Sequence, residues 1–379
     1  MKGFLTTHKG MEDVAALEVK ELIDKKSKID EACVVFDIKN YEDLFKLCYK
    51  SQSAIGVFYL LAEFNYKDIF NDTKKNIEKS NLKEWLSKNT KFRVNCIKNH
   101  EDKISTPEIE EKLGEIIIDH IQKKYNYKQK VDLENPEIIF SFHLNKKKCF
   151  IGIDFAGFDL SKRSYKILQH AGDIKGTIAY FLVRSANFNK NETLLDPFSG
   201  SGTIPIEAAL FASSFPVNFF NKEKFIFLKF NKFNDFNKLF KKLDKESSQS
   251  KLKINNLDSS MKHINYAKKN SKLAGIEKRI NFSRMDAEWL DTKFSKGKID
   301  KIITKFPSSQ QKERDTYNEF FYQAEFILNN KGKIVLIGNK GMIEKLSSKY
   351  NFQISEKKKV YTGKQEYDVF ILDKLKKDI

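Results

Sequence analysis

The alternation of hydrophobic and polar positions changes near residue 160. Before that point, short strands and amphipathic helices follow one another in small α+β units. The first unit spans residues 1–64 and opens with a strand at Gly3–Thr6. A helix follows, and its apolar positions are Val14, Leu17, Leu22 and Ile23. The other elements expected in this unit are strands at Cys33–Ile38 and Ile55–Phe64 and a helix at Tyr41–Lys50.

A second unit is expected over residues 65–160. Its longest element is a helix at Thr106–Tyr125, where Thr106 can cap the first turn and Pro107 fits within it. The strands Ile138–Leu144 and Cys149–Asp154 are separated by a short turn. The remaining elements expected here are helices at Ile69–Glu78 and Leu82–Lys88 and a strand at Lys91–Ile97.

From residue 161 to 379, short apolar strands alternate with helical stretches. This order predicts an α/β domain with a mostly parallel sheet and helices on both faces. Phe370–Leu372 is expected at the edge of the sheet, and residues 218–250 form an insertion whose aromatic residues cover a core or line a groove. The strands are expected at Leu194–Leu195, Leu252–Leu257, Ile280–Ser283, Lys301–Thr304 and Lys333–Gly338, and the helices at Ile204–Ala212, Met261–Ala274 and Tyr317–Leu328.

Composition adds an expected partner and excludes some classes of protein. The chain has 69 Lys and Arg against 51 Asp and Glu, a net charge of +18, which favours a polyanion such as RNA. Alternatively, the chain is rich in Lys for reasons of composition, and its exposed faces carry Lys although no polyanion binds them. The four cysteines and six histidines form no metal-ligand spacing, so no metal and buried, reduced thiols are expected. No apolar stretch is long enough for a membrane span or a signal core, and we expect a cytoplasmic protein.

The stretch Glu192–Ala212 is the most informative about which ligand the protein binds. A strand runs into Asp196, a turn follows at Ser199-Gly200-Ser201-Gly202, and a helix begins after it. A nucleoside triphosphate would need a Lys after the last glycine, and a dinucleotide would need a third glycine; neither is present. S-adenosylmethionine needs a tight turn beside its methionine part and acceptors for its ribose and adenine.

Two further acids stand where such a ligand would need them. Asp258 ends one strand and can accept from ribose hydroxyls, and Asp286 follows the next strand and can accept from the adenine amine. Both lie at strand ends, where open α/β sheets bind ligands, although an Asp at a strand end is often only a helix cap.

These residues and their order resemble the THUMP-domain RNA methyltransferases, in particular the tRNA guanine-N2 methyltransferases. The resemblance extends over almost the whole chain and is strongest at LLDPFSGSGTIPIEAAL. It implies a ferredoxin-like first unit, a THUMP domain that binds tRNA or another structured RNA, and a Rossmann-like domain that binds S-adenosylmethionine. The cofactor loop would comprise Asp196, Pro197, Ser199, Gly200, Gly202 and Thr203, with Asp258 at the ribose, Asp286 at the adenine, and Lys175 and Thr177 near the opening of the site.

The family's catalytic motif corresponds here to Lys305-Phe306-Pro307-Ser308-Ser309. The family has Asn or Asp at the first position, whose oxygen accepts hydrogens from the guanine amine, and an aromatic residue at the fourth. Lys305 has only donors when charged, although a buried Lys can lose its proton and act as a base. Ser308 stands where the family's aromatic residue stacks on the base; Phe306 could stack in its place, but it comes two residues earlier in the chain and points in another direction. The residues that could form an RNA-binding face in the second unit are Lys91, Arg93, Lys98, Lys103, Lys112, Lys146, Lys147 and Lys148.

Three functions stay open at this point. The first is S-adenosylmethionine-dependent methylation of tRNA guanine N2, motivated by the loop at Asp196–Thr203. The second is a catalytically inactive, tRNA-binding relative, motivated by Lys305 and Ser308. The third is a nicotinamide-dependent enzyme, because doubly wound sheets host many chemistries.

Overall fold

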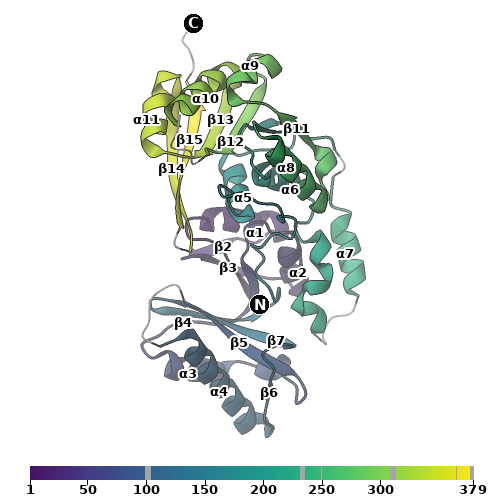
Figure 1. Ribbon diagram of the computed structural model, residues 1–379. Helices are drawn as coiled ribbons and strands as arrows, with labels where there is room; N and C mark the ends of the chain where they lie inside the picture. The colour runs from purple at the N-terminus through teal and green to yellow at the C-terminus, as the bar shows by residue number, and fades with distance from the viewer. Residues whose placement is uncertain (99–103, 231–234, 249, 308–312, 364, 376–379) are drawn as a thin grey trace.

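The protein is built on two sheets, which follow one another along the long axis of the molecule (Figure 1). A computed structural model describes the chain except for residues 99–103, 231–234, 249, 308–312, 364 and 376–379. The N-terminal sheet forms the lower and central parts in that view, and the C-terminal sheet forms the upper part. No helix in the described ranges is long and apolar enough to cross a membrane.

The N-terminal sheet has eight strands in the order β2-β3-β1-β4-β8-β7-β5-β6. It runs without interruption across the boundary expected at residues 64 and 65, because β4 pairs with β8 on one side and β1 on the other. Its strands are β1 (Lys2–Thr6), β2 (Ser27–Asp30), β3 (Cys33–Asp37), β4 (Gly56–Asn65), β5 (Lys91–Lys98), β6 (Lys130–Val131), β7 (Ile138–Asn145) and β8 (Lys148–Asp154). Its helices are α1 (Glu12–Ile23), α2 (Tyr41–Lys50), α3 (Ile69–Lys79) and α4 (Thr106–Tyr125).

Two expected details of this half were wrong. Ser105, not Thr106, caps α4: its side chain accepts the Glu108 N–H and the Glu108 carboxylate accepts the Ser105 N–H, so the pair forms a capping box. The helix expected at residues 82–88 is a single turn at Leu82–Glu84. Polar turn formers follow it, and the Ser87 carbonyl accepts the Thr90 N–H in a new turn.

The C-terminal sheet has the order β11-β10-β9-β12-β13-β15-β14, and its first five strands are parallel, as the sequence predicted. The expected edge position of Phe370–Leu372 was wrong. These residues belong to β15, which is hydrogen-bonded on both sides, and the edge strand is β14. The strands are β9 (Thr193–Asp196), β10 (Lys253–Asp258), β11 (Ile280–Arg284), β12 (Ile299–Lys305), β13 (Leu328–Ile337), β14 (Phe352–Thr362) and β15 (Gln365–Lys374).

Helices cover both faces of this sheet, and successive residues of a strand face opposite cores. Leu194 and Ile303 pack with α5 (Gly176–Ser185) and α6 (Thr203–Ala212). Leu195 and Ile302 pack on the other side with α10 (Glu313–Ile327) and α11 (Lys340–Lys349). The remaining helices of this half are α8 (Met261–Leu273) and α9 (Leu290–Lys293).

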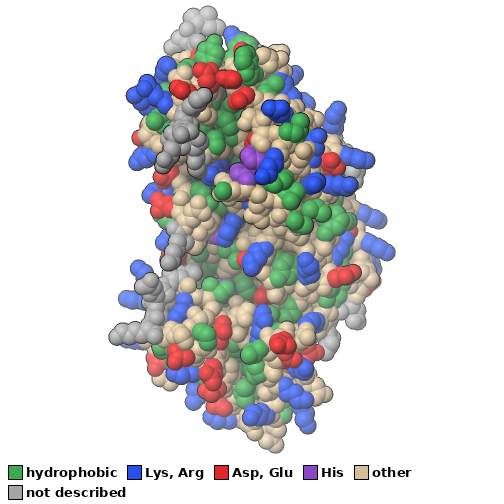
Figure 2. Space-filling model, viewed as in Figure 1, with side chains coloured by type: hydrophobic (Ala, Val, Ile, Leu, Met, Phe, Trp, Pro, Cys, Tyr) green, Lys and Arg blue, Asp and Glu red, His purple; other side chains and the backbone are tan. Residues whose placement is uncertain are grey.

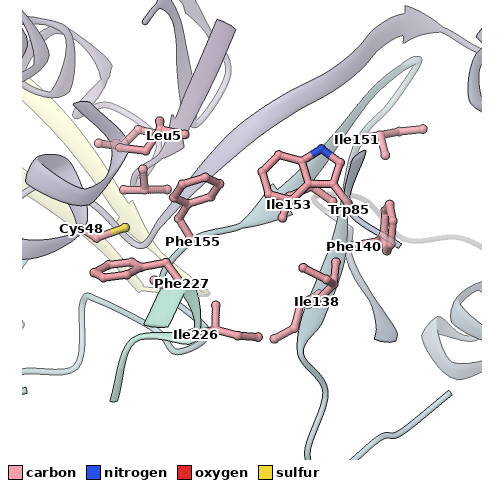
Figure 3. Packing of buried hydrophobic residues seen from close by; sticks show 14 of the residues in the cluster. Leu5, Cys48, Trp85, Ile138, Phe140, Ile151, Ile153, Phe155, Ile226 and Phe227 are labelled. Carbon is pink, nitrogen blue, oxygen red and sulfur yellow. The ribbon is translucent and has the colours of Figure 1, made fainter. Parts of the chain in front are cut away.

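The insertion packs against the N-terminal half, so its aromatic residues cover a core. Phe227 lies 4.6 Å from Phe45 between ring centroids, and Phe230 lies 5.2 Å from Phe155. Figure 3 shows Phe227 near Cys48 and Phe155, and Ile226 near Ile138. The insertion contains two 3-10 turns, Phe219–Lys224 and Ile226–Lys229, and α7 (Phe236–Asp244).

A buried polar cluster joins the two halves. The Glu207 carboxylate, on α6, accepts hydrogen bonds from Arg163 Nε at 2.7 Å, Gln52 Nε2 at 2.6 Å and the Tyr165 hydroxyl at 2.6 Å. Gln52 follows α2, so the cluster links the N-terminal sheet to the helix that follows the glycine turn. All four cysteines are buried and unpaired, as predicted.

Replacing Phe227 by Ala should therefore destabilise the protein strongly. The side chain is fully buried, so its removal should cost about 3–5 kcal/mol and lower the midpoint of urea unfolding. Phe220→Ala is the matched control, because that residue belongs to the same insertion but is 58% exposed. Equal midpoint shifts for the two variants would contradict this packing of the insertion.

Candidate active site

The glycine turn after β9 requires its two glycines. Gly200 has φ +53° and Gly202 has φ +82°, the left-handed region that L side chains rarely adopt. A Cβ atom on Gly200 would lie 2.0 Å from His170 Nε2, and one on Gly202 would lie 2.7 Å from the Ala267 Cβ. The turn can keep its shape only with glycine at both positions.

The three predicted carboxylates converge on one cleft beside this turn. Asp196, Asp258 and Asp286 all line a space of about 790 Å³, part of which is open to solvent. They meet because β9, β10 and β11 are parallel neighbours, so their carboxyl ends reach the same edge of the sheet. The other predicted residues that line the cleft are Pro197, Ser199, Gly200, Thr203, Lys305, Phe306 and Pro307, while Gly202 packs behind the turn against Ala267.

Asp258 holds the turn in place. Its Oδ2 accepts the Gly200 N–H at 2.9 Å, and its Oδ1 accepts the Ser260 N–H at 2.9 Å. His263 Nδ1 lies 3.0 Å from the same Oδ1. The residue expected to bind ribose therefore also fixes the backbone beside the ligand.

Asp196 is the most perturbed carboxyl group of the cleft. Burial raises its pKa to about 7, although the Thr304 hydroxyl donates to it at 2.6 Å and the Phe198 N–H donates at 3.2 Å. The negative charge of Asp258 raises the pKa further. Asp196 therefore changes its charge near neutral pH.

Two residues that the sequence did not single out, His170 and Asp173, also line the cleft. His170 Nδ1 accepts the Gly172 N–H at 3.0 Å, which leaves Nε2 to donate to Asp173 at 2.8 Å. Asp173 also accepts from the Ser201 hydroxyl at 2.5 Å; burial alone would raise its pKa, but the hydrogen bonds from His170 and Ser201 outweigh burial and lower it. The loop at 161–175 has no hydrophobic period, so periodicity could not have found these residues.

His170 and His263 form a stacked pair at the mouth of the cleft. Their ring centroids lie 4.7 Å apart with an angle of 20° between the planes. The pair joins the 161–175 loop to α8 above the glycine turn. Lys175 is exposed and Thr177 is buried in α5; among the described residues, Gly172, Asp173 and Ile174 line the cleft in their place.

The three described residues of the stretch that corresponds to the family's catalytic motif have different environments. Lys305 lines the cleft, and burial lowers the pKa of its amine while Asp173 partly offsets that effect. Phe306 is 3% exposed and stacks on Tyr317 at 3.7 Å, so most of its ring belongs to the core. Pro307 is exposed at the rim. Ser308 lies outside the described residues.

The cleft offers the groups that an adenosyl sulfonium requires. Ser199 Oγ is buried in the turn without a hydrogen-bond partner among the described residues, and it can serve a polar ligand. Asp258 and Asp286 supply acceptors for hydroxyl and amine hydrogens. Four carboxylates and one Lys give the cleft a composition that favours a cationic ligand.

The predicted RNA-binding residues are divided between the two ends of β5. Lys98 lies beside the β7–β8 turn that carries Lys146 and Lys147, both of which are exposed. Lys91 lies at the opposite end of β5 and pairs with Asp132 at 2.9 Å. Lys148 pairs with Asp30 and Glu63, and the half-buried Arg93 donates to the Leu133 carbonyl. Lys112, on α4, lies over the Phe70 ring, and Lys103 lies outside the described residues.

Asp196→Asn should stabilise the protein at high pH only. The wild-type carboxyl resists ionisation in the folded state, so folding becomes less favourable as pH rises from about 4 to about 7, by up to roughly 4 kcal/mol. Asn keeps the acceptor for Thr304 and Phe198 but does not titrate. The unfolding temperature of the variant should exceed that of the wild type at about pH 8 and approach it near pH 4. Asp37→Asn, at the exposed end of β3, is the control. A difference in unfolding temperature that stays constant across this range, or the same trend in the control, would contradict burial of the Asp196 carboxyl as the cause.

The chain is similar to known methyltransferases over nearly its whole length. The chain is 29% identical to a tRNA (guanine(6)-N2)-methyltransferase of Methanocaldococcus jannaschii over 98% of its length and 100% of that protein. It is 27% identical to the Archaeoglobus fulgidus protein of the same name over 88% of its length and 82% of that protein. Among solved structures, SMU.472 complexed with SAH has a TM-score of 0.82 at 19% identity, covering 100% of this chain and 99% of that one. TrmN from Thermus thermophilus has a TM-score of 0.71 at 21% identity, covering 99% of each chain.

Family models match a part of each half of the chain. The model of the THUMP domain matches residues 67–154. The model described as the RMKL-like methyltransferase domain matches residues 163–368, more than half of the chain. The chain therefore belongs to the RMKL-like methyltransferase family and carries a THUMP domain before its catalytic fold.

Proposed function

We propose that this protein transfers a methyl group from S-adenosylmethionine to the N2 atom of a guanosine in tRNA. The observation that carries the proposal is the convergence of the Gly200–Gly202 turn with Asp196, Asp258 and Asp286 in one cleft. The names of the M. jannaschii and A. fulgidus relatives support the choice of tRNA guanine N2.

Asp258 has few hydrogen-bond acceptor sites left for the ribose. A carboxylate offers about four acceptor sites, and the protein uses three of them at Gly200, Ser260 and His263. Oδ2 keeps one site for a hydroxyl, and a second hydroxyl on Asp258 requires His263 to turn away. His263 would have to release Oδ1 if both ribose hydroxyls were held by Asp258.

Methyl transfer to guanine N2 needs a group that receives a proton. The cofactor supplies a methyl group on a positively charged sulfur, and the guanine amine that attacks it becomes cationic until it loses a proton. Lys305 is the candidate acceptor, because it lines the cleft and burial lowers the pKa of its amine. Neutral Lys305 can accept the amine proton, and charged Lys305 would oppose the reaction.

A catalytically inactive, tRNA-binding protein is the second candidate, and Lys305 is also the observation that favours it. A Lys that keeps its proton cannot accept hydrogens from the guanine amine. The fold would then serve to hold tRNA without turnover. The two candidates predict different results in the same assay.

The first test is methyl transfer to tRNA. The full chain, incubated with tRNA that lacks the modification and with methyl-labelled cofactor, should label tRNA at guanine N2, identified by nucleoside mass analysis. The first candidate fails if no tRNA from any unmodified pool accepts label. Binding of tRNA without label would leave the second candidate standing.

The pH profile tests the role of Lys305. The wild-type rate should rise with pH as the amine loses its proton, because only the neutral form is productive. Lys305→Met keeps the length of the side chain and should lower the rate by on the order of 10- to 100-fold. Lys305→Asn restores an acceptor oxygen, and its rate should no longer depend on that titration. An unchanged pH profile in both variants would show that Lys305 does not take the proton.

A further inference from the structure

The insertion helix α7 presents a stripe of lysines that no catalytic role explains. Lys238, Lys241, Lys242 and Lys245 follow the spacing i, i+3, i+4 and i+7, so they lie on one side of the helix. All four are exposed, and together with Asp235 and Asn237 they line a hollow in the surface. We call these four residues the α7 lysine stripe.

The acids of the insertion do not neutralise this stripe. Residues 218–250 contain eight Lys and four acidic residues. Asp244 pairs with Lys222 at 2.6 Å and accepts from Tyr49, and Glu246 pairs with Lys46 and Lys50 on α2. Asp235 caps the helix by accepting the Lys238 N–H. Within the described residues, no carboxylate lies within ion-pair distance of a stripe lysine.

The stripe is held on a rigid base. Phe240 and Leu243, on the opposite side of α7, are buried in the N-terminal core. The Phe240 ring lies 4.9 Å from that of Tyr49, on α2. The helix therefore presents its charges at a fixed place beside both halves of the molecule.

The helix that carries the stripe and the helix beside the cleft are both seen from one side of the molecule. Figure 2 shows Lys and Arg side chains gathered along the right edge of the molecule, where α7 lies in Figure 1. The same view shows His side chains over α8, the helix that carries His263 of the cleft. A long polyanion can therefore contact the stripe while one of its nucleotides reaches the cleft.

We propose that the α7 lysine stripe binds the phosphate backbone of the RNA substrate, outside the THUMP domain and outside the cofactor cleft. The proposal rests on the proposed function, because it assumes that the substrate is an RNA large enough to span both places. Like-charged side chains at i, i+3 and i+4 repel each other in the free protein, and neutralisation by phosphates removes that repulsion. The contacts would fix the position of the RNA without reading its sequence.

A simpler account is that the lysines serve the helix itself. Three of them lie in or just beyond the last turn, where positive charge interacts favourably with the helix dipole. That account predicts a lower stability when the charges are removed and no effect on RNA binding.

The test compares two variants of equal charge. The stripe variant is Lys238→Gln, Lys241→Gln, Lys242→Gln and Lys245→Gln in the full chain. The control replaces four other exposed lysines by Gln, namely Lys296, Lys298, Lys340 and Lys345. Binding of unmodified tRNA is measured by fluorescence anisotropy from about 50 to 200 mM salt, together with S-adenosylmethionine binding and the unfolding temperature.

The stripe variant should bind tRNA more weakly than the control at every salt concentration. The slope of log affinity against log salt should fall by about one for each phosphate that is no longer neutralised, up to about four, while cofactor binding stays unchanged. Equal affinities and slopes in the two variants would overturn the proposal and leave the proposed function intact. Absence of tRNA binding by the wild type would instead remove the proposed function and this inference together.

Discussion

The hydrogen bond from the Gly200 N–H to Asp258 is the contact on which the cleft depends. A backbone with positive φ at Gly200 directs its N–H toward β10 and not along α6. The carboxylate that receives it stands at the end of β10 because β10 lies between β9 and β11. Asp258 thus shapes the turn and also lines the cleft. The carboxylate that can bind the ligand is therefore the one that holds the turn in its binding conformation.

The contacts of Gln52 with the buried ion pair of Arg163 and Glu207 connect this turn to the N-terminal half. Buried charges contribute little to stability unless their polar atoms are satisfied, and here Arg163 also donates to the carbonyls of Leu160 and Gln52. These contacts favour one relative placement of the two halves, because any other placement would leave Arg163 and Glu207 without their buried hydrogen bonds to Gln52. Glu207 lies on α6, one turn beyond Thr203, so the half that carries the THUMP domain is coupled to the helix of the cofactor turn.

The sequence predicted those features that local patterns encode. Short apolar strands at regular intervals indicated the parallel sheet, and strand-end acids next to a glycine turn indicated the cleft. His170 and Asp173 were beyond such reasoning, because they lie in a loop and act through contacts with Gly172 and Ser201. The edge strand β14 was missed for a related reason: its charged sequence lacks alternation, and its pairing with β15 supplies the structure. The continuity of the N-terminal sheet depends on the pairing of β4 with β8, which are far apart in the chain.

Net charge alone did not indicate where RNA would bind, because the acids decide which lysines remain available. Lys91 and Lys148, at opposite ends of the N-terminal sheet, are paired with carboxylates, and an RNA phosphate would have to displace those partners. Lys146 and Lys147 are exposed in the β7–β8 turn, and the acids near the α7 lysine stripe pair with other lysines. When a phosphate binds an unpaired lysine, counterions are released and no existing ion pair is broken. A polyanion therefore gains the most binding free energy at these places. The positive charge of the chain therefore acts through its distribution, and the insertion contributes to that distribution as directly as the THUMP domain does.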